Sequence, residues 1–253
     1  TWEAFADAME TVRVNGEAMG YYSYGSGQGS IRMFNAALAA TPAGAEMLKG
    51  PLTADAINSE EFADAFRTVA TLDQQNGSAN SSVNANDFAA DFNNGLSAVF
   101  INGVWGASQF AGSDNFVSCI YPNSVAISSA NTGLYVANDL SDAQKELALE
   151  FIKYMTSEEV QSRYFLETSS NPINENVDIQ KLAQESGDPT ALKLAEACDK
   201  CNKADTIVLA IDVCWGNDVG GALQNKFAEC AVAGTDIEAK LAELQAELTA
   251  LIG

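Results

Sequence analysis

Few residues in this sequence are of the types that usually carry chemistry, and histidine is absent. Without imidazole, Ser/Cys–His triads and most zinc or iron enzymes are excluded. Cys198 and Cys201 form a Cys-x-x-Cys motif, the spacing of a redox pair or of half a zinc site. The motif lies late in a helical pattern, and no second pair completes a set of ligands. With five cysteines in all, an odd number, we predict at least one free thiol, a structural role for this pair and no bound metal.

Adjacent tyrosines and numerous carboxylates leave two alternative functions open. Tyr21 and Tyr22 are hard phenolate ligands of the kind that ferric-ion transport proteins use, although no further ligands follow at a recognisable spacing. Paired carboxylates are the catalytic groups of glycoside hydrolases. Most acidic residues here lie at helical positions where exposure to solvent explains them. A ferric-ion-binding transport protein and an acidic glycoside hydrolase are therefore kept as alternatives.

Two tryptophans are the strongest candidates for contact with a ligand. Trp105 comes shortly after Asn102-Gly103, and Trp215 follows Asp212 near an expected helix start. Both lie where an element ends, and the clefts of α/β proteins are built at such positions. The face of an indole ring can cover the apolar side of a sugar ring, a burial that contributes about 1–3 kcal/mol, so we expect both rings to be partly exposed. The glycine-rich loop 25–30 would allow close approach of the backbone to a ligand.

The charge balance excludes further classes of function. The 253 residues include 13 Lys and Arg against 34 Asp and Glu, a formal charge of −21. Nucleic-acid binding needs a clustered basic surface, and the same negative field repels anionic lipids. The length and a hydrophobic content of 47% predict one large domain or two modest ones with a packed core. No apolar run approaches the roughly 18 residues of a membrane span.

Periodicity and capping patterns predict helices that alternate with short strands, which is an α/β architecture. Helix starts are expected at Thr1, Asn58, Ser141, Thr156, Asp188 and Thr235. Strands are expected at 19–24, 96–101, 116–121 and 134–136. The last helix carries an apolar stripe that we predict to pack into a core, formed by Ile237, Leu241, Leu244, Leu248 and Leu251.

Several segments together carry a family resemblance. Residues 91–105 (DFNNGLSAVFINGVW) resemble the F-x-x-G-x-x-A-M-x-x-x-G-x-W segment of family 1 extracellular solute-binding proteins, the maltose-binding-protein-like receptors of ABC importers. Residues 1–5 resemble that family's T-W-[DE]-E-[FL], and residues 58–62 its N-S-P-E-F. Residues 145–161 are similar to A-W-E-F-I-K-F-L-T-S-P-E-V-Q, and Ser170-Asn171-Pro172 follows where a G-x-[IL]-P-like turn is expected. Their order across nearly the whole chain identifies it as a member.

The resemblance implies a periplasmic-binding-protein-like fold of two lobes (type II). In that family the T-W-x-E-F helix lies well inside the mature protein, so we expect an N-terminal segment, which would build most of the N-terminal lobe, to be missing. The sequence opens on Thr1 without a signal segment, in keeping with a processed or excised chain. Residues 1–130 and 175–253 are then expected in the C-terminal lobe, and residues 131–174 are expected to cross to the N-terminal lobe.

The resemblance also implies a function without catalysis or a cofactor. The protein would be a carbohydrate-binding receptor that captures a mono- or oligosaccharide and delivers it to an ABC transporter permease by closing its lobes around the ligand. It would be a monomer, extracellular, and either a cell-surface lipoprotein, anchored through the missing N-terminus, or periplasmic. The expected ligand-binding residues are Trp105, Trp215, Tyr22, Tyr24, Asn102, Thr132, Gly133, Asn171 and Asp212.

Overall fold

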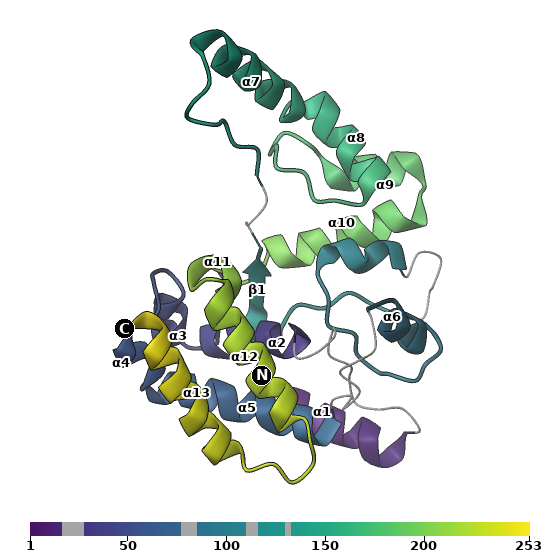
Figure 1. Ribbon diagram of the computed structural model, residues 1–253. Helices are drawn as coiled ribbons and strands as arrows, with labels where there is room; N and C mark the ends of the chain where they lie inside the picture. Colours follow the sequence, from purple (N-terminus) through teal and green to yellow (C-terminus); the bar gives the residue numbers. More distant parts are fainter. Residues whose placement is uncertain (17–27, 77–84, 110–115, 130–132) are drawn as a thin grey trace. The chain divides into compact units, whose positions relative to one another are not determined.

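The computed structural model describes residues 1–16, 28–76, 85–109, 116–129 and 133–253 (Figure 1). The chain forms two compact units. Unit 1 comprises Thr1–Asn102, Ile120–Ala130 and Lys203–Gly253, and unit 2 comprises Gly103–Cys119 and Asn131–Asn202. The sequence analysis expected only residues 131–174 to cross between lobes. In the structure, residues 103–119 and 175–202 group with them in unit 2. The lobe to which each unit belongs stays a prediction.

Unit 1 is a helix-rich α/β unit. Its elements before the first strand are α1 (Trp2–Asn15), α2 (Gln28–Ala39), α3 (Pro42–Met47), α4 (Ala54–Ile57), α5 (Glu60–Asn76), α6 (Ala85–Asn93) and the 3₁₀ turn η2 (Pro122–Ser124). They are followed by β1 (Val125–Ser128), β2 (Thr206–Leu209), α11 (Ile211–Cys214), α12 (Asn217–Cys230) and α13 (Ile237–Ile252).

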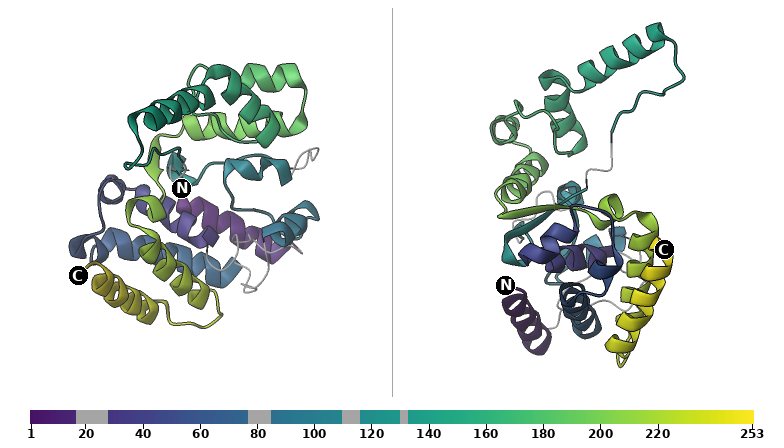
Figure 2. Two further views of the ribbon diagram at one scale, coloured as in Figure 1. Left: turned by 45° about the horizontal axis from the view of Figure 1, so that its top comes forward. Right: turned by 90° about the vertical axis from the view of Figure 1, so that its left-hand side faces the viewer.

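Unit 2 is helical in its described residues. It contains η1 (Val104–Gln109), α7 (Asp142–Met155), α8 (Glu158–Thr168), α9 (Ile179–Ser186) and α10 (Pro189–Asn202). Phe165, Leu194 and Cys198 are buried in a core that α8, α9, α10 and η1 share. By contrast, α7 projects from the other helices of the unit and buries none of its residues (Figures 1 and 2). No described helix, α7 included, is both long and apolar enough to cross a membrane.

Three helices begin where the sequence predicts. Thr1 Oγ1 accepts a hydrogen bond from the Ala4 N–H at 3.2 Å, which caps α1. Ser141 forms the predicted capping box with the third residue of α7. Asp188 Oδ1 accepts the Thr190 N–H at 3.0 Å, at the start of α10. These local patterns are confirmed because a cap uses only atoms within one helical turn.

Three other helices begin one residue later than predicted. The residues that cap α5, α8 and α13 are Ser59, Ser157 and Asp236, in place of Asn58, Thr156 and Thr235. In each case two residues capable of capping are adjacent in the sequence. Only the second stands directly before the first helical residue and reaches the free N–H groups of the first turn. Asn58 and Thr156, the first residues of two of these pairs, cap the C-terminal ends of the preceding helices α4 and α7.

The described residues contain fewer strands than the sequence predicts. β1 and β2 pair in parallel, with Val125 opposite Thr206 and Ser128 opposite Leu209. Neither was predicted, and the predicted strands at 96–101, 116–121 and 134–136 do not form. The predicted strand at 19–24 lies outside the described residues. Branched and aromatic residues favour extended backbone, but only a paired neighbour turns such a segment into a strand.

The core of unit 1 is built around four phenylalanines from α2, α5 and α12. Phe34 and Phe62 meet edge to face at 5.1 Å between ring centroids, and Phe66 stacks on Phe227 at 4.9 Å. All four side chains are fully buried. The predicted burial of the stripe on α13 is confirmed for Leu241, Leu244 and Leu248, whereas Leu251 is exposed in the last turn.

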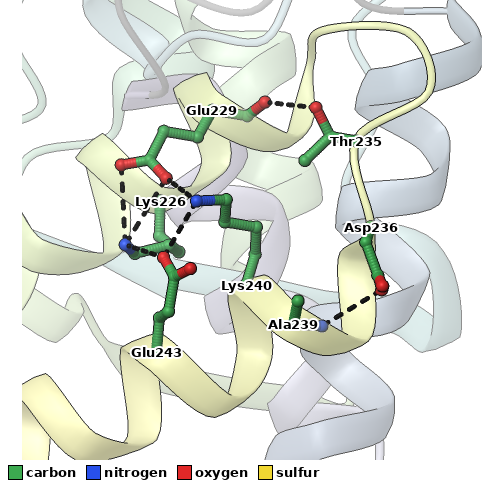
Figure 3. Close-up of polar contacts among 7 residues, drawn as sticks. All are labelled: Lys226, Glu229, Thr235, Asp236, Ala239, Lys240 and Glu243. Carbon is green, nitrogen blue, oxygen red and sulfur yellow. Dashed lines mark hydrogen bonds and ion pairs between the residues drawn. The ribbon is translucent and has the colours of Figure 1, made fainter.

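An ion-pair cluster joins α12 to α13 (Figure 3). Lys226, whose side chain is only 9% exposed, lies 3.1 Å from Glu243 and 3.5 Å from Glu229. Lys240 lies 2.8 Å from Glu229 and 2.9 Å from Glu243. The alternation of two cations and two anions leaves no charge of the cluster without an opposite neighbour. Thr235 Oγ1 donates to the Glu229 carbonyl at 3.1 Å and closes the turn between the helices.

Acid is expected to weaken this contact. Hydrogen bonds from Lys240 lower the pKa of both Glu229 and Glu243. A carboxyl group whose pKa is lowered by folding stabilises the fold above its unfolded pKa, and this contribution is lost as the pH falls through the folded value. Between about pH 7 and pH 3, Lys240→Met is therefore expected to lose less stability than the wild type in urea unfolding. Lys49→Met, which removes an exposed pair with Glu46, is the control. Equal losses in Lys240→Met and the wild type would contradict the prediction.

Gly44 fixes the approach of α3 to the end of α2. A Cβ atom at position 44 would overlap the carbonyl oxygen of Leu38, which is backbone and cannot turn aside. We expect Gly44→Ala to lower the free energy of unfolding by roughly 1–3 kcal/mol. Gly50→Ala is the matched control, since a Cβ there meets nothing within 4 Å. Chemical denaturation of both variants measures the difference, and equal stabilities would refute the assignment.

Candidate functional site

The carboxyl ends of β1 and β2 lie side by side, because the strands are parallel and Ser128 is opposite Leu209. Just beyond them, the Ala210 N–H donates to the Ser128 carbonyl at 2.9 Å, and α11 begins at the next residue. In open α/β sheets ligands bind outside the carboxyl ends of the strands. The turn from β2 into α11 is therefore the place in unit 1 where a ligand is expected.

The side chain of Asn35 in α2 forms hydrogen bonds with the backbone on both sides of this turn. Its side chain is fully buried, its Oδ1 accepts the Ile211 N–H at 3.0 Å and its Nδ2 donates to the Leu209 carbonyl at 3.3 Å. Since α11 has no side-chain cap of its own, Asn35 supplies the acceptor that the first N–H of this helix requires. No local sequence pattern links Asn35 to a turn 176 residues away, so the sequence did not reveal this role.

Arg32 lies one helical turn before Asn35 and pairs with Asp212. Its Nη1 is 2.5 Å from Asp212 Oδ1, and the two side chains are 31% and 23% exposed. The hydrogen bond from Arg32 holds the pKa of the Asp212 carboxyl below its usual value, against the opposing effect of burial. Asp212, predicted as a ligand residue, is thus an ionised carboxylate that is half-buried at the end of β2. Arg32 was not predicted.

Trp215 ends α11 and points into the core. The side chain is 8% exposed, its ring stacks on Phe62 at 6.4 Å between centroids, and its Nε1 donates to the Met47 carbonyl at 3.2 Å. The sequence-based expectation of a partly exposed ring is therefore wrong for Trp215. The turn of α11 directs residue 215 toward α3 and α5 while Asp212 stays near the surface.

Trp105 is exposed, as predicted. It lies in η1 of unit 2 with 55% of its surface accessible. The indole ring folds back over Gly103, so closely that a Cβ atom at position 103 would overlap three of its ring carbons. The glycine of the Asn-Gly pair thus gives the ring room to lie flat against the backbone. An exposed indole with one face supported in this way has its other face available for stacking.

A second exposed aromatic ring in unit 2 also lies close to the glycine two residues before it, although less closely than Trp105 does. The Tyr135 hydroxyl and ring would lie 3.2–3.4 Å from a Cβ atom at Gly133, and Tyr135 is 84% exposed. Gly133 was predicted as a ligand residue, whereas Tyr135 was assigned to a strand. The repeated pattern of glycine, any residue and aromatic residue could have identified it from the sequence.

The other predicted site residues are placed as follows. Asn102 is half-buried at the end of a segment of unit 1, and Asn171 is exposed in the loop after α8 of unit 2. Tyr22, Tyr24 and Thr132 lie outside the described residues, as does Tyr21 of the ferric alternative. The structure thus places Asp212 in α11 and Trp215 directly after it, and Trp105, Gly133 and Asn171 in the other unit. Contact of any of these residues with a ligand stays a prediction.

All five cysteines are free thiols. Burial raises the pKa of Cys198 to about 12 and those of Cys214 and Cys230 to about 11. Within the described residues, no group of three or more Cys, Asp or Glu side chains is arranged to hold a metal ion. The Cys-x-x-Cys motif lies in the last turns of α10, and Cys198 is part of the core of unit 2.

Thiol titration checks this assignment. With Ellman's reagent, the denatured and unreduced protein is expected to show five reactive thiols per chain. In the native protein Cys119, which is exposed, is expected to react first, and the buried Cys198 and Cys230 only after unfolding. Cys119→Ser should remove the fast phase alone. A total below five would show a disulfide that the structure does not contain.

Comparison with known proteins identifies the family to which this chain is similar. The family described as bacterial extracellular solute-binding protein matches residues 1–190. A Streptococcus pneumoniae solute-binding protein, solved in complex with the blood group A-trisaccharide, is 38% identical, with a TM-score of 0.90 over 99% of this chain and 64% of that chain. The chain therefore spans less than two thirds of that relative's length. No curated protein sequence matches.

More distant structures share the fold. One, from work on xylan utilization by Caldanaerobius polysaccharolyticus, is 16% identical with a TM-score of 0.67, over 98% of this chain and 65% of that chain. The maltose-bound MalE3 of T. maritima is 15% identical with a TM-score of 0.63, over 99% and 65% of the two chains. The helix-rich α/β fold is thus that of the two-lobed, periplasmic-binding-protein-like proteins. Together with the match over residues 1–190, these findings show that the chain belongs to the family of bacterial extracellular solute-binding proteins.

Proposed function

We propose that the chain is part of a carbohydrate-binding receptor that captures a mono- or oligosaccharide and delivers it to the permease of an ABC importer. The observation that carries the proposal is the 38% identity, over 99% of the chain, to a solute-binding protein in complex with the blood group A-trisaccharide. The chain spans only 64% of that relative. The sugar ligand and the permease partner of the whole receptor are therefore proposed and do not follow from the similarity alone.

Two kinds of contact would hold the sugar. The exposed ring of Trp105 offers a flat apolar face for the C–H side of a pyranose ring. Asp212 offers a carboxylate that accepts hydrogen bonds from hydroxyl groups. Both contacts bind without making or breaking covalent bonds, so we propose a receptor that is not an enzyme and needs no cofactor.

Closure of the two lobes of the whole receptor around the sugar would complete the binding site. Contacts that a sugar makes only in the closed form would shift the population toward closure.

We further propose that residues 1–130 and 175–253 belong to the C-terminal lobe and that residues 131–174 cross to the N-terminal lobe. The exposed Leu147, Phe151 and Tyr154 share one face of α7. In the N-terminal lobe this face would pack on residues that correspond to the part of the pneumococcal relative outside the match. The receptor would be monomeric and extracellular, either periplasmic or held at the cell surface by a lipid anchor.

Isothermal titration calorimetry of the intact protein tests the proposal. The blood group A-trisaccharide, its component monosaccharides and maltose are titrated in the absence of iron, and reducing sugar is measured after prolonged incubation. Binding of at least one saccharide without turnover is expected. Release of reducing sugar would favour a glycoside hydrolase, and a tyrosinate-to-iron charge-transfer band lost in Tyr21→Phe or Tyr22→Phe would favour a ferric carrier.

A further inference from the structure

We propose that Arg32 is a positioning residue of the saccharide site, which holds the Asp212 carboxylate ready to accept a hydrogen bond from a ligand hydroxyl group. The inference rests on the proposed function and adds Arg32, a residue of α2, to the proposed binding site. It also specifies the ligand chemistry at the turn from β2 into α11, namely an uncharged hydroxyl donor.

The geometry places both partners at the end of the sheet. α2 packs against β1 and α11 (Figure 1). Arg32 and Asn35, three residues apart on α2, face the same turn: Asn35 fixes its backbone on both sides, at Leu209 and Ile211, and Arg32 fixes the side chain of Asp212. The backbone and the carboxylate of the turn are therefore both fixed by α2.

The chemistry of the pair leaves capacity for a ligand. Arg32 engages Oδ1 of Asp212 through Nη1, and a carboxylate has a second oxygen with its own lone pairs. An ionised carboxylate only accepts hydrogen bonds, so it suits a hydroxyl donor and repels a carboxylated sugar. The partial exposure of both side chains keeps them within reach of a molecule from solution.

A purely structural role would explain less. Partly exposed ion pairs add little to stability, and the backbone of the turn is already held by the buried Asn35. Arg67 offers a contrast within the same unit, because it pairs with Glu60, Asp64 and Glu238 on the surface formed by α5 and α13. It therefore provides a matched control.

The experiment compares Arg32→Met, Arg32→Lys, Asp212→Asn and the double variant Arg32→Met/Asp212→Asn with Arg67→Met in the intact protein. The affinity for the blood group A-trisaccharide is measured by calorimetry from about pH 8 to pH 4, and thermal unfolding is followed in parallel. We expect Arg32→Met and Asp212→Asn each to weaken binding by about 10- to 100-fold. The double variant should be no weaker than the worse single variant, because the two residues act as one unit.

The pH profile separates positioning from folding. The wild type should keep its affinity to a lower pH than Arg32→Met, in which Asp212 has lost the partner that keeps it ionised. Arg32→Lys should restore part of the affinity, and Arg67→Met should leave it unchanged. If the wild type binds and the Arg32 variants lose thermal stability but neither affinity nor pH profile, the inference is overturned and the proposed function stands. If the folded wild type binds no saccharide, the proposed function fails and the inference fails with it.

Discussion

Replacing Trp215 with alanine is expected to lower the free energy of unfolding by roughly 3–5 kcal/mol, the range for removing a buried aromatic side chain. The ring stacks on Phe62, is 8% exposed, and ties α11 to α3 through its bond to the Met47 carbonyl. Its loss would leave a cavity in the core of unit 1 and an unpaired carbonyl. Urea denaturation of the purified variant measures the effect.

Two further variants separate the contribution of the buried ring from that of its hydrogen bond and from the effect of removing an exposed tryptophan. Trp215→Phe keeps most of the apolar ring but removes the Nε1 donor, so it should cost less than alanine, with a contribution of about 1 kcal/mol from the lost hydrogen bond. Trp105→Ala should change stability by no more than about 0.5 kcal/mol, because the ring is exposed. A Trp215→Ala protein as stable as Trp105→Ala would show that the indole is not part of the core.

The second large effect is expected on binding. Trp105→Ala should weaken saccharide affinity by about 5- to 150-fold, the loss of roughly 1–3 kcal/mol of stacking on one ring face. The measurement is calorimetric titration of the intact protein with the saccharide that the wild type binds best. Unchanged affinity in the folded variant would remove Trp105 from the site.

Gly103→Ala provides an independent test of the same ring. A methyl group at position 103 overlaps the indole, so the ring must leave the backbone that supports it. Affinity is expected to fall although the tryptophan is still present. Gly221→Ala in α12 is the control, since a Cβ there meets nothing within 4 Å, and its affinity should equal that of the wild type.

The sequence predicted well those features that depend on neighbouring residues. The capping box at Ser141 and the N-terminal proline of α10 were found because a helix start involves atoms within one turn. The burial of Leu241, Leu244 and Leu248 followed from helical periodicity. Where two capping residues are adjacent, as at Ser157 and at Asp236, the local pattern allowed either, and the second is the cap because it stands directly before the first helical residue.

Strands and site geometry depend on partners that the local sequence does not specify. Val125–Ser128 becomes β1 only because Thr206–Leu209 lies beside it, some 80 residues later in the chain. Asp212 was selected for its place near Trp215, but its partner Arg32 is 180 residues away. The sequence of α2 gave no indication that this helix would contact the residues at the end of β2.

The sequence alone determined the family, the exclusion of histidine chemistry and the helical framework, because motif order, composition and periodicity are properties of the chain itself. The tertiary structure decided the roles of the two tryptophans. Both follow similar signals at the ends of elements, yet Trp215 packs on Phe62 and Trp105 lies over Gly103 with its other face exposed. The physical reason is that burial depends on which distant elements surround a side chain once the chain has folded, and the residues next to it in the sequence do not fix that environment.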